Sequence, residues 1–232
     1  MYKQIAAVCL SVFLVGCSTT TKTKVAGSSY HFANYTHTII AESLVSGLQV
    51  RLVRLSGGTS TCVSGTADHI ELNGPIGPDS TYIVAKYLDM AQPCKNSDGT
   101  RIGTFVYLNS VGGFITDGME LGRLFRKQQV ITKVMGDQKC ASSCAVAFLG
   151  GTYRTMTSEA ELIFHAPYRR ASYGQVECAS INEAKPLKSY YSRMVGKQTG
   201  GILFDRTMSY CGSTVGWVIN TGAAMAYGIL SF

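Results

Sequence analysis

The chain of 232 residues has little charge, no concentrated basic stretch and no clustered histidine. Although Lys and Arg outnumber Asp and Glu by 21 to 14, no basic run is longer than a pair such as Arg169-Arg170. Surfaces that bind nucleic acid concentrate basic residues and interleave them with aromatics, so this pattern disfavours a nucleic-acid partner. The mild positive excess favours contact with an anionic membrane surface instead.

The spacing of ligands for a structural metal is also missing. Cys140 and Cys144 have no second ligand pair nearby, and the four histidines are scattered, so we expect no metal site. The sequence has no internal repeat, and 46% hydrophobic residues over this length indicate one substantial core.

The N-terminal apolar stretch, residues 5–15, is too short to span a bilayer, because about 11 residues stand where roughly 20 are needed. Lys3 precedes it and Leu14-Val15-Gly16-Cys17 follows it. This arrangement resembles a bacterial lipoprotein signal, which implies that residues 1–16 are a signal peptide and that Cys17 is acylated, for example with palmitate. We expect a lipid-anchored protein of the bacterial cell envelope, on the inner or outer membrane and facing the periplasm. A plain secretory signal is the alternative.

Cysteine usage agrees with export. Without Cys9 and Cys17, six cysteines remain, and an even number in an oxidising compartment predicts up to three disulfides. They are Cys62, Cys94, Cys140, Cys144, Cys178 and Cys211. Their pairing stays open. Bonded to each other or to other cysteines, Cys140 and Cys144 would lock the turn between them.

The pattern of residues divides the chain into three parts after the signal. Residues 17–30 predict a flexible tether and residues 31–68 a small β extension, with strands at 35–40 and 49–55. Residues 69–232 predict a larger α/β domain with βαβ crossovers and a mostly parallel sheet. Its expected strands are 70–72, 104–108, 130–135 and 161–164; its expected helices are 80–91, one ending near 126, 141–149, 190–198 and 223–227; its expected breaks are Gly200-Gly201 and Gly212.

Three segments that could carry chemistry follow predicted strands. Gly112-Gly113 would let main-chain N–H groups approach a ligand oxygen. Ser143 begins an apolar helix, where the helix dipole favours a negative oxygen. His165 ends a strand, where an imidazole can act as a general base. Each also has an ordinary interpretation: a turn, a helix cap and a structural histidine.

Together these segments resemble the Clp-protease proteolytic subunit family over roughly two-thirds of the chain. The resemblance lies in four stretches that occur in the family's order: residues 69–76 (HIELNGPI), 107–113 (YLNSVGG), 141–151 (ASSCAVAFLGG) and 162–167 (LIFHAP). It implies a ClpP/crotonase-like βαβ spiral. It also implies that Ser143 is the nucleophile, His165 the general base, and the N–H groups of Gly113 and Cys144 the oxyanion hole.

The sequence departs from the family at several positions. Val111 replaces a proline, Cys144 follows the serine where the family has methionine, and Ser142 offers a competing hydroxyl. The aspartate that orients the family's histidine is missing where it is expected, and Asp205 and Asn220 are the nearest substitutes.

We therefore expect an exported serine hydrolase, a peptidase without a cofactor, that acts on peptides or proteins. It would be held at the membrane by its lipid, and a homo-oligomer is among its expected partners. The alternative is a catalytically inactive scaffold of the same fold that serves binding or assembly. A crotonase-type enzyme is disfavoured by export, because coenzyme A is cytosolic. A Ser-Lys mechanism through Lys133 or Lys139 is disfavoured by the presence of His165.

Overall fold

The computed structural model describes residues 22–24, 29–32, 35–57, 66–95, 97–212 and 214–231. The expected signal peptide, Cys17, most of the expected tether and Cys62 lie outside the described residues. Within the described ranges, no helix combines the length and the apolar character needed to cross a membrane.

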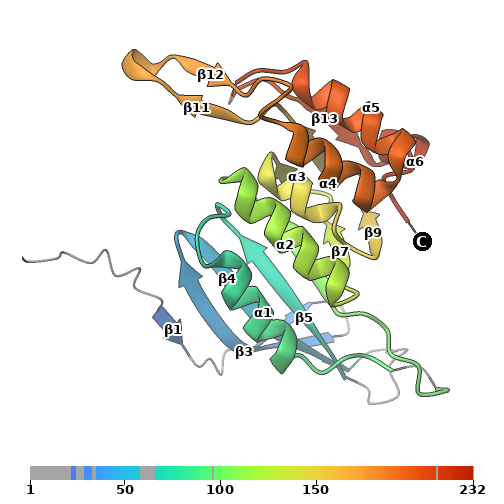
Figure 1. Ribbon diagram of the computed structural model, residues 1–232. Helices are drawn as coiled ribbons and strands as arrows, with labels where there is room; N and C mark the ends of the chain where they lie inside the picture. The colour runs from blue at the N-terminus through green and yellow to red at the C-terminus, as the bar shows by residue number, and fades with distance from the viewer. Residues whose placement is uncertain are drawn as a thin grey trace, which may run out of the picture.

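A central sheet of eight strands runs through the molecule (Figure 1). Strands β5, β6, β7 and β9 are parallel neighbours, whereas β1 to β4 join the sheet antiparallel. The expected α/β class with parallel crossovers is therefore confirmed. The strands are β1 (Lys22–Lys24), β2 (Ser29–Phe32), β3 (Tyr35–Val45), β4 (Leu48–Gly57), β5 (Thr66–Asn73), β6 (Phe105–Asn109), β7 (Ile131–Val134) and β9 (Tyr153–Met156).

The two strands expected before residue 57 form an antiparallel hairpin, β3 and β4. Ser46 and Gly47 connect them, both with positive φ (48° and 85°), as the tight turns that suit the twist of a hairpin require. Because β4 also pairs along its length with β5, these strands extend the main sheet and form no separate layer.

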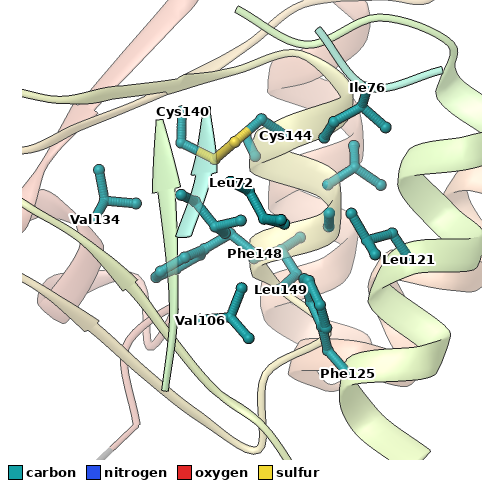
Figure 2. Packing of buried hydrophobic residues seen from close by; sticks show 14 of the residues in the cluster. Leu72, Ile76, Val106, Leu121, Phe125, Val134, Cys140, Cys144, Phe148 and Leu149 are labelled. Atoms are coloured by element: carbon teal, nitrogen blue, oxygen red, sulfur yellow. A yellow bond between two sulfur atoms is a disulfide. The ribbon is translucent and has the colours of Figure 1, made fainter. Parts of the chain in front are cut away.

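Helices α1 (Ser80–Met90) and α2 (Ile115–Lys127) lie side by side, and α1 contacts β3, β4 and β5 (Figure 1). The buried apolar residues of α1 are Ile83, Val84, Tyr87 and Leu88, which recur at helical spacing. In Figure 2, Leu72 and Val106 from the sheet pack against Leu121 and Phe125 from α2 and Phe148 from α3 (Ser143–Phe148). This packing fixes α3 between the sheet and α2.

Glycine lets α2 and the end of α3 approach each other closely. A Cβ added at Gly150 would overlap the backbone of Gly122, so neither element could keep its place with a side chain there. Beside this contact, the Arg126 guanidinium donates to the carbonyl oxygens of Leu149 and Gly151 at 3.1 and 3.0 Å. A cation at this position is favourable because the carbonyl groups at a helix C-terminus lack partners within the helix.

A second sheet brings together three strands that are far apart in the sequence. It consists of β8 (Lys139–Ala141), β10 (Glu161–Phe164) and β13 (Trp217–Asn220). Strand β8 runs parallel to β10, with Ala141 opposite Ile163. The residues that follow these two strands therefore emerge at the same edge.

A two-stranded hairpin projects from the body beyond β10 (Figure 1). It is made of β11 (Tyr168–Arg170) and β12 (Val176–Cys178), with a short 3-10 turn, η1 (Ser172–Gly174), between them. The chain then forms α4 (Lys185–Val195), α5 (Lys197–Met208) and α6 (Thr221–Ala226).

The expected break at Gly200-Gly201 is wrong, because both glycines lie inside α5. Gly200 instead allows α5 to cross α4 closely, since a Cβ there would come within 2.6 Å of the Ser192 backbone nitrogen.

We predict that Gly150→Ala destabilises the fold by about 1–3 kcal/mol, the usual range for overpacking a tight contact. Gly201→Ala is the matched control, because nothing lies within 4 Å of its added Cβ, and alanine is the better helix former by about 1 kcal/mol. Urea unfolding followed by circular dichroism measures both. Equal midpoints for Gly150→Ala and the parent protein would contradict the close packing of α2 and α3.

Candidate active site

A strained turn connects β8 to α3 at Ser142. Its backbone has φ 56° and ψ −124°, in the left-handed half of conformational space that non-glycine residues avoid. Such conformations cost about 1–3 kcal/mol and persist only where neighbouring structure holds them. Here the Ser142 N–H donates to the Ile163 carbonyl at 2.7 Å, and the Ser142 carbonyl accepts from the Val146 N–H at 3.1 Å.

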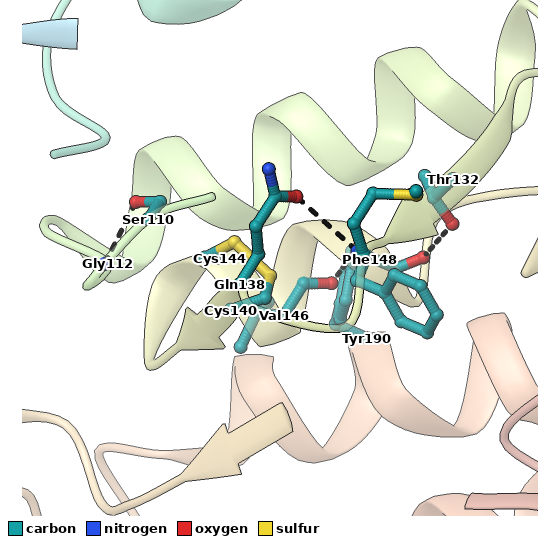
Figure 3. The surroundings of a disulfide bond; sticks show 10 residues. Ser110, Gly112, Thr132, Gln138, Cys140, Cys144, Val146, Phe148 and Tyr190 are labelled. Atoms are coloured by element: carbon teal, nitrogen blue, oxygen red, sulfur yellow. Dashed lines mark hydrogen bonds between the residues drawn. A yellow bond between two sulfur atoms is a disulfide. The ribbon is translucent and has the colours of Figure 1, made fainter. Parts of the chain in front are cut away.

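A disulfide closes around this turn. Cys140, at the middle of β8, bonds to Cys144 in the first turn of α3, and both are fully buried (Figure 2 and Figure 3). Of the pairings that the sequence left open, the structure therefore contains the one that brackets the serines. A second disulfide joins Cys178 to Cys211, and Cys94 is also disulfide-bonded.

The two neighbouring serines have different surroundings. Ser143 is 0% exposed, its backbone and Cβ lie close to Gly118 of α2, and its hydroxyl has no hydrogen-bond partner among the described residues. Ser142 is partly exposed and lines a cleft of about 670 Å³. The hydroxyl at the cleft thus belongs to Ser142 and not to Ser143, on which the sequence-based prediction rested. The sequence carries no signal that separates the two hydroxyls, because their difference lies in the backbone dihedral angles of the turn.

His165 lines the same cleft as Ser142. It follows β10, and its Nδ1 lies 3.0 Å from the Ala166 carbonyl oxygen. A carbonyl only accepts, so this contact favours the tautomer with hydrogen on Nδ1 and a free lone pair on Nε2. No hydrogen bond joins the two side chains within the described part of the chain, a common situation in free enzymes.

Among the described residues, the main-chain N–H groups of Gly113, Ser143 and Cys144, all near Ser142, have no acceptor. Gly113 lines the cleft, and Ser143 is the first residue of α3, where N–H groups lack partners within the helix. Gly112 has φ 97°, and a Cβ on it would come within 2.6 Å of the Ser142 Cβ, so only glycine fits against the turn. Neither Ser143 nor Cys144, the other predicted donor, lines the cleft, but the Ser143 N–H directly follows Ser142, which does.

Neither sequence-based candidate for a third member of the site is placed beside His165. Asn220 pairs with Glu161 at the opposite end of β10, and its side chain caps α6 by accepting from the Ala223 N–H at 2.9 Å. Asp205 is exposed on α5 and does not line the cleft. The group that contacts the His165 ring nitrogen is a backbone carbonyl, for which no residue type is diagnostic in a sequence.

The two lysines also lie away from Ser142. Lys139 forms an exposed ion pair with Glu161 at 3.0 Å, and Lys133 lies 5.8 Å from the Tyr107 ring centroid. Neither lines the cleft. The geometry thus gives the Ser-Lys alternative no support.

A second cavity, of about 390 Å³, contains His37, His69 and Glu71 from the central sheet. The imidazole of His69 lies 3.3 Å from the Glu71 carboxylate, and burial together with the charge of His69 lowers the pKa of His37. Despite these groups, the described ranges hold no set of three or more His, Cys, Asp or Glu side chains arranged to bind a metal ion.

The chain is similar to a known protein family in sequence and to a solved structure in fold. Residues 67–229 match the family model described as Clp protease. Among solved structures, the chain is similar to a serine-to-alanine mutant of the 1510-N membrane-bound stomatin-specific protease, with a TM-score of 0.54 and 11% identity over 69% of this chain and 75% of that one. No curated protein sequence matches the chain.

We predict that removing the disulfide at the turn, in Cys140→Ala/Cys144→Ala, lowers the unfolding free energy by about 2 kcal/mol, the chain-entropy value for so short a loop. Amide hydrogen exchange of residues 142–144 should also accelerate, because the strained turn loses its covalent brace. Cys178→Ala/Cys211→Ala is the control: it loses a disulfide without changing exchange at 142–144. Unchanged exchange in the first variant would show that the disulfide does not hold the turn.

Proposed function

Because this chain belongs to the Clp protease family, we propose that it is an exported serine hydrolase, specifically a peptidase, with Ser142 as nucleophile and His165 as general base. The observation that carries the proposal is the placement of Ser142. It is a serine held in a strained turn between a strand and a helix, lining the same cleft as a histidine. Strained nucleophile turns of this kind expose the hydroxyl above the end of a sheet in other hydrolases.

The first step is attack by Ser142 Oγ on a substrate carbonyl carbon, while Nε2 of His165 accepts the hydroxyl proton. The Ala166 carbonyl supports this step, because its contact with Nδ1 (3.0 Å) holds the imidazole in the required tautomer. A backbone carbonyl carries no full charge, so it orients the ring but stabilises the imidazolium less than an aspartate would.

The N–H groups of Gly113 and Ser143 would hold the oxygen that becomes negative in this step. Both donors are free in the described structure, and the second sits at the start of α3, where the N–H groups of a helix favour negative charge. The imidazolium then gives its proton to the leaving amine, and water hydrolyses the acyl-enzyme by the same route in reverse. This chemistry needs no cofactor.

The proposal includes export and a lipid anchor on Cys17. What supports it is the sequence alone: the positive start, the short apolar stretch and the cysteine that follows it. The disulfides of the described part fit an oxidising compartment. In that compartment the substrates would be peptides or loosened proteins, and a homo-oligomer is part of what the family resemblance implies.

The second candidate function is an inactive scaffold of the same fold. One observation favours it: among the described residues, no carboxylate contacts His165, so the third member found in related enzymes has no counterpart here. The two candidates differ in whether Ser142 reacts with an electrophile.

We predict that a fluorophosphonate probe labels the protein and that Ser142→Ala abolishes labelling, whereas Ser143→Ala retains it. His165→Ala should slow labelling by about 10³-fold, as loss of a general base in such a site does. Ser143→Ala is a stringent control, because its buried hydroxyl has no partner in the described part of the chain and its loss should not lower the unfolding midpoint. Labelling read by mass spectrometry decides the matter, and a well-folded protein that never reacts favours the scaffold.

We also predict that cells fed labelled palmitate incorporate it into the wild-type chain and not into Cys17→Ser. The wild type should partition with membranes, because acyl chains bury their CH₂ groups in lipid at about 0.8 kcal/mol each. Cys9→Ser, within the signal, is the matched control and should remain labelled. Equal labelling of wild type and Cys17→Ser would remove the anchor from the proposal.

A further inference from the structure

The two walls of the active-site cleft differ in chemistry. One wall is apolar and open: Val111 is 77% exposed and Phe114 is 63% exposed, next to Gly113. A second wall comes from β11 and contains Arg169 and Arg170. Among the described residues that line the cleft, none carries a carboxylate. An extended peptide between these walls would meet an apolar surface on one side and positive charge on the other.

The two arginines are not equivalent. Arg169 donates to both carboxylate oxygens of Glu177 at 2.9 and 2.8 Å, across the β11–β12 ladder. This two-point contact raises the pKa of Arg169 and balances its charge locally. Arg170 has Val176 as its cross-strand neighbour, and its side chain makes no ion pair or hydrogen bond with the described residues. The net positive charge of this wall therefore rests on Arg170.

The alternation of side chains in β11 sets the direction of Arg170. Residues two apart on a strand point to the same face, so Arg170 shares a face with Tyr168. The Tyr168 ring lies 5.5 Å from the His165 ring, which places that face on the side of the catalytic histidine. Arg170 is about 7 Å further along the strand, at roughly 3.3 Å per residue. It would contact a neighbouring side chain of the substrate and not the carbonyl under attack.

We propose that Arg170 makes this cleft select peptides that carry an acidic side chain close to the scissile bond, next to an apolar residue that packs on Val111 and Phe114. This inference rests on the proposed peptidase function and names its substrate class. Because Arg170 is exposed, the selectivity is moderate: a guanidinium–carboxylate pair in contact with water corresponds to about fivefold in kcat/KM, and it weakens as salt rises.

The test uses the full-length protein and matched fluorogenic peptides that share one apolar residue and place Glu, Gln or Lys at each position within three residues of the scissile bond. Wild type should cleave the best Glu peptide about fivefold faster than its Gln partner, and the Lys partner more slowly still. Arg170→Gln should make the three rates equal, and Arg170→Glu should reverse their order. Lys127→Glu changes the charge equally at the far end of α2, outside the cleft, and should keep the wild-type order.

A binding measurement separates this inference from the peptidase proposal. In Ser142→Ala, fluorescence polarisation should show tighter binding of the Glu peptide than of the Lys peptide, and Arg170→Glu added to this variant should reverse the preference. Cleavage without acidic preference, or a preference unchanged by Arg170→Glu, overturns the role of Arg170 and leaves the peptidase intact. Preferential binding without any cleavage supports Arg170 while the peptidase proposal fails.

Discussion

The conformation of the turn at Ser142 is the constraint on which the candidate site depends. A non-glycine residue with positive φ is unfavourable, and here it is held from three directions: the Cys140–Cys144 bond, the hydrogen bond to Ile163 and the contact with Gly112. As a result, the side chains of the two adjacent serines point to different surroundings. One side chain is turned to the cleft, while the other is packed into the protein with its hydroxyl unused. A turn in a relaxed backbone conformation would not hold the two serine side chains in this arrangement.

Much of the fold could be predicted from patterns of apolar residues. The helix at 80–91 and the strand at 161–164 were found within a residue, because their periodicity agrees with what tertiary packing requires. The disulfide pairing and the strands β8 and β13 could not be found in this way. Short strands carry too few residues to show a period, and pairing depends on which chain segments meet only after folding.

The sequence-based candidate site includes the strained turn, but it names Ser143, whose side chain is buried, and not Ser142, which lines the cleft. The glycines, the serines and His165 each follow a strand, and the carboxyl ends of neighbouring parallel strands lie close together. The choice between two adjacent hydroxyls depends on backbone dihedral angles, which the residue letters do not determine. The partner of the His165 imidazole could not be predicted from the sequence either, since it is a backbone carbonyl and every residue has one. Asp205 and Asn220 were candidates only because a sequence identifies side chains and not the positions of backbone carbonyl groups.

The end of the chain closes one side of the central sheet. Ser231 pairs with Arg154 on the outermost strand β9, and its hydroxyl donates to the Thr152 carbonyl at 3.1 Å. Unpaired outer strands invite main-chain pairing with other polypeptides and hence aggregation. Ser231 occupies the main-chain N–H and carbonyl groups of Arg154, in β9, through two hydrogen bonds of 3.2 Å. Intermolecular strand addition, a common route to amyloid-like assembly, is therefore obstructed on that flank.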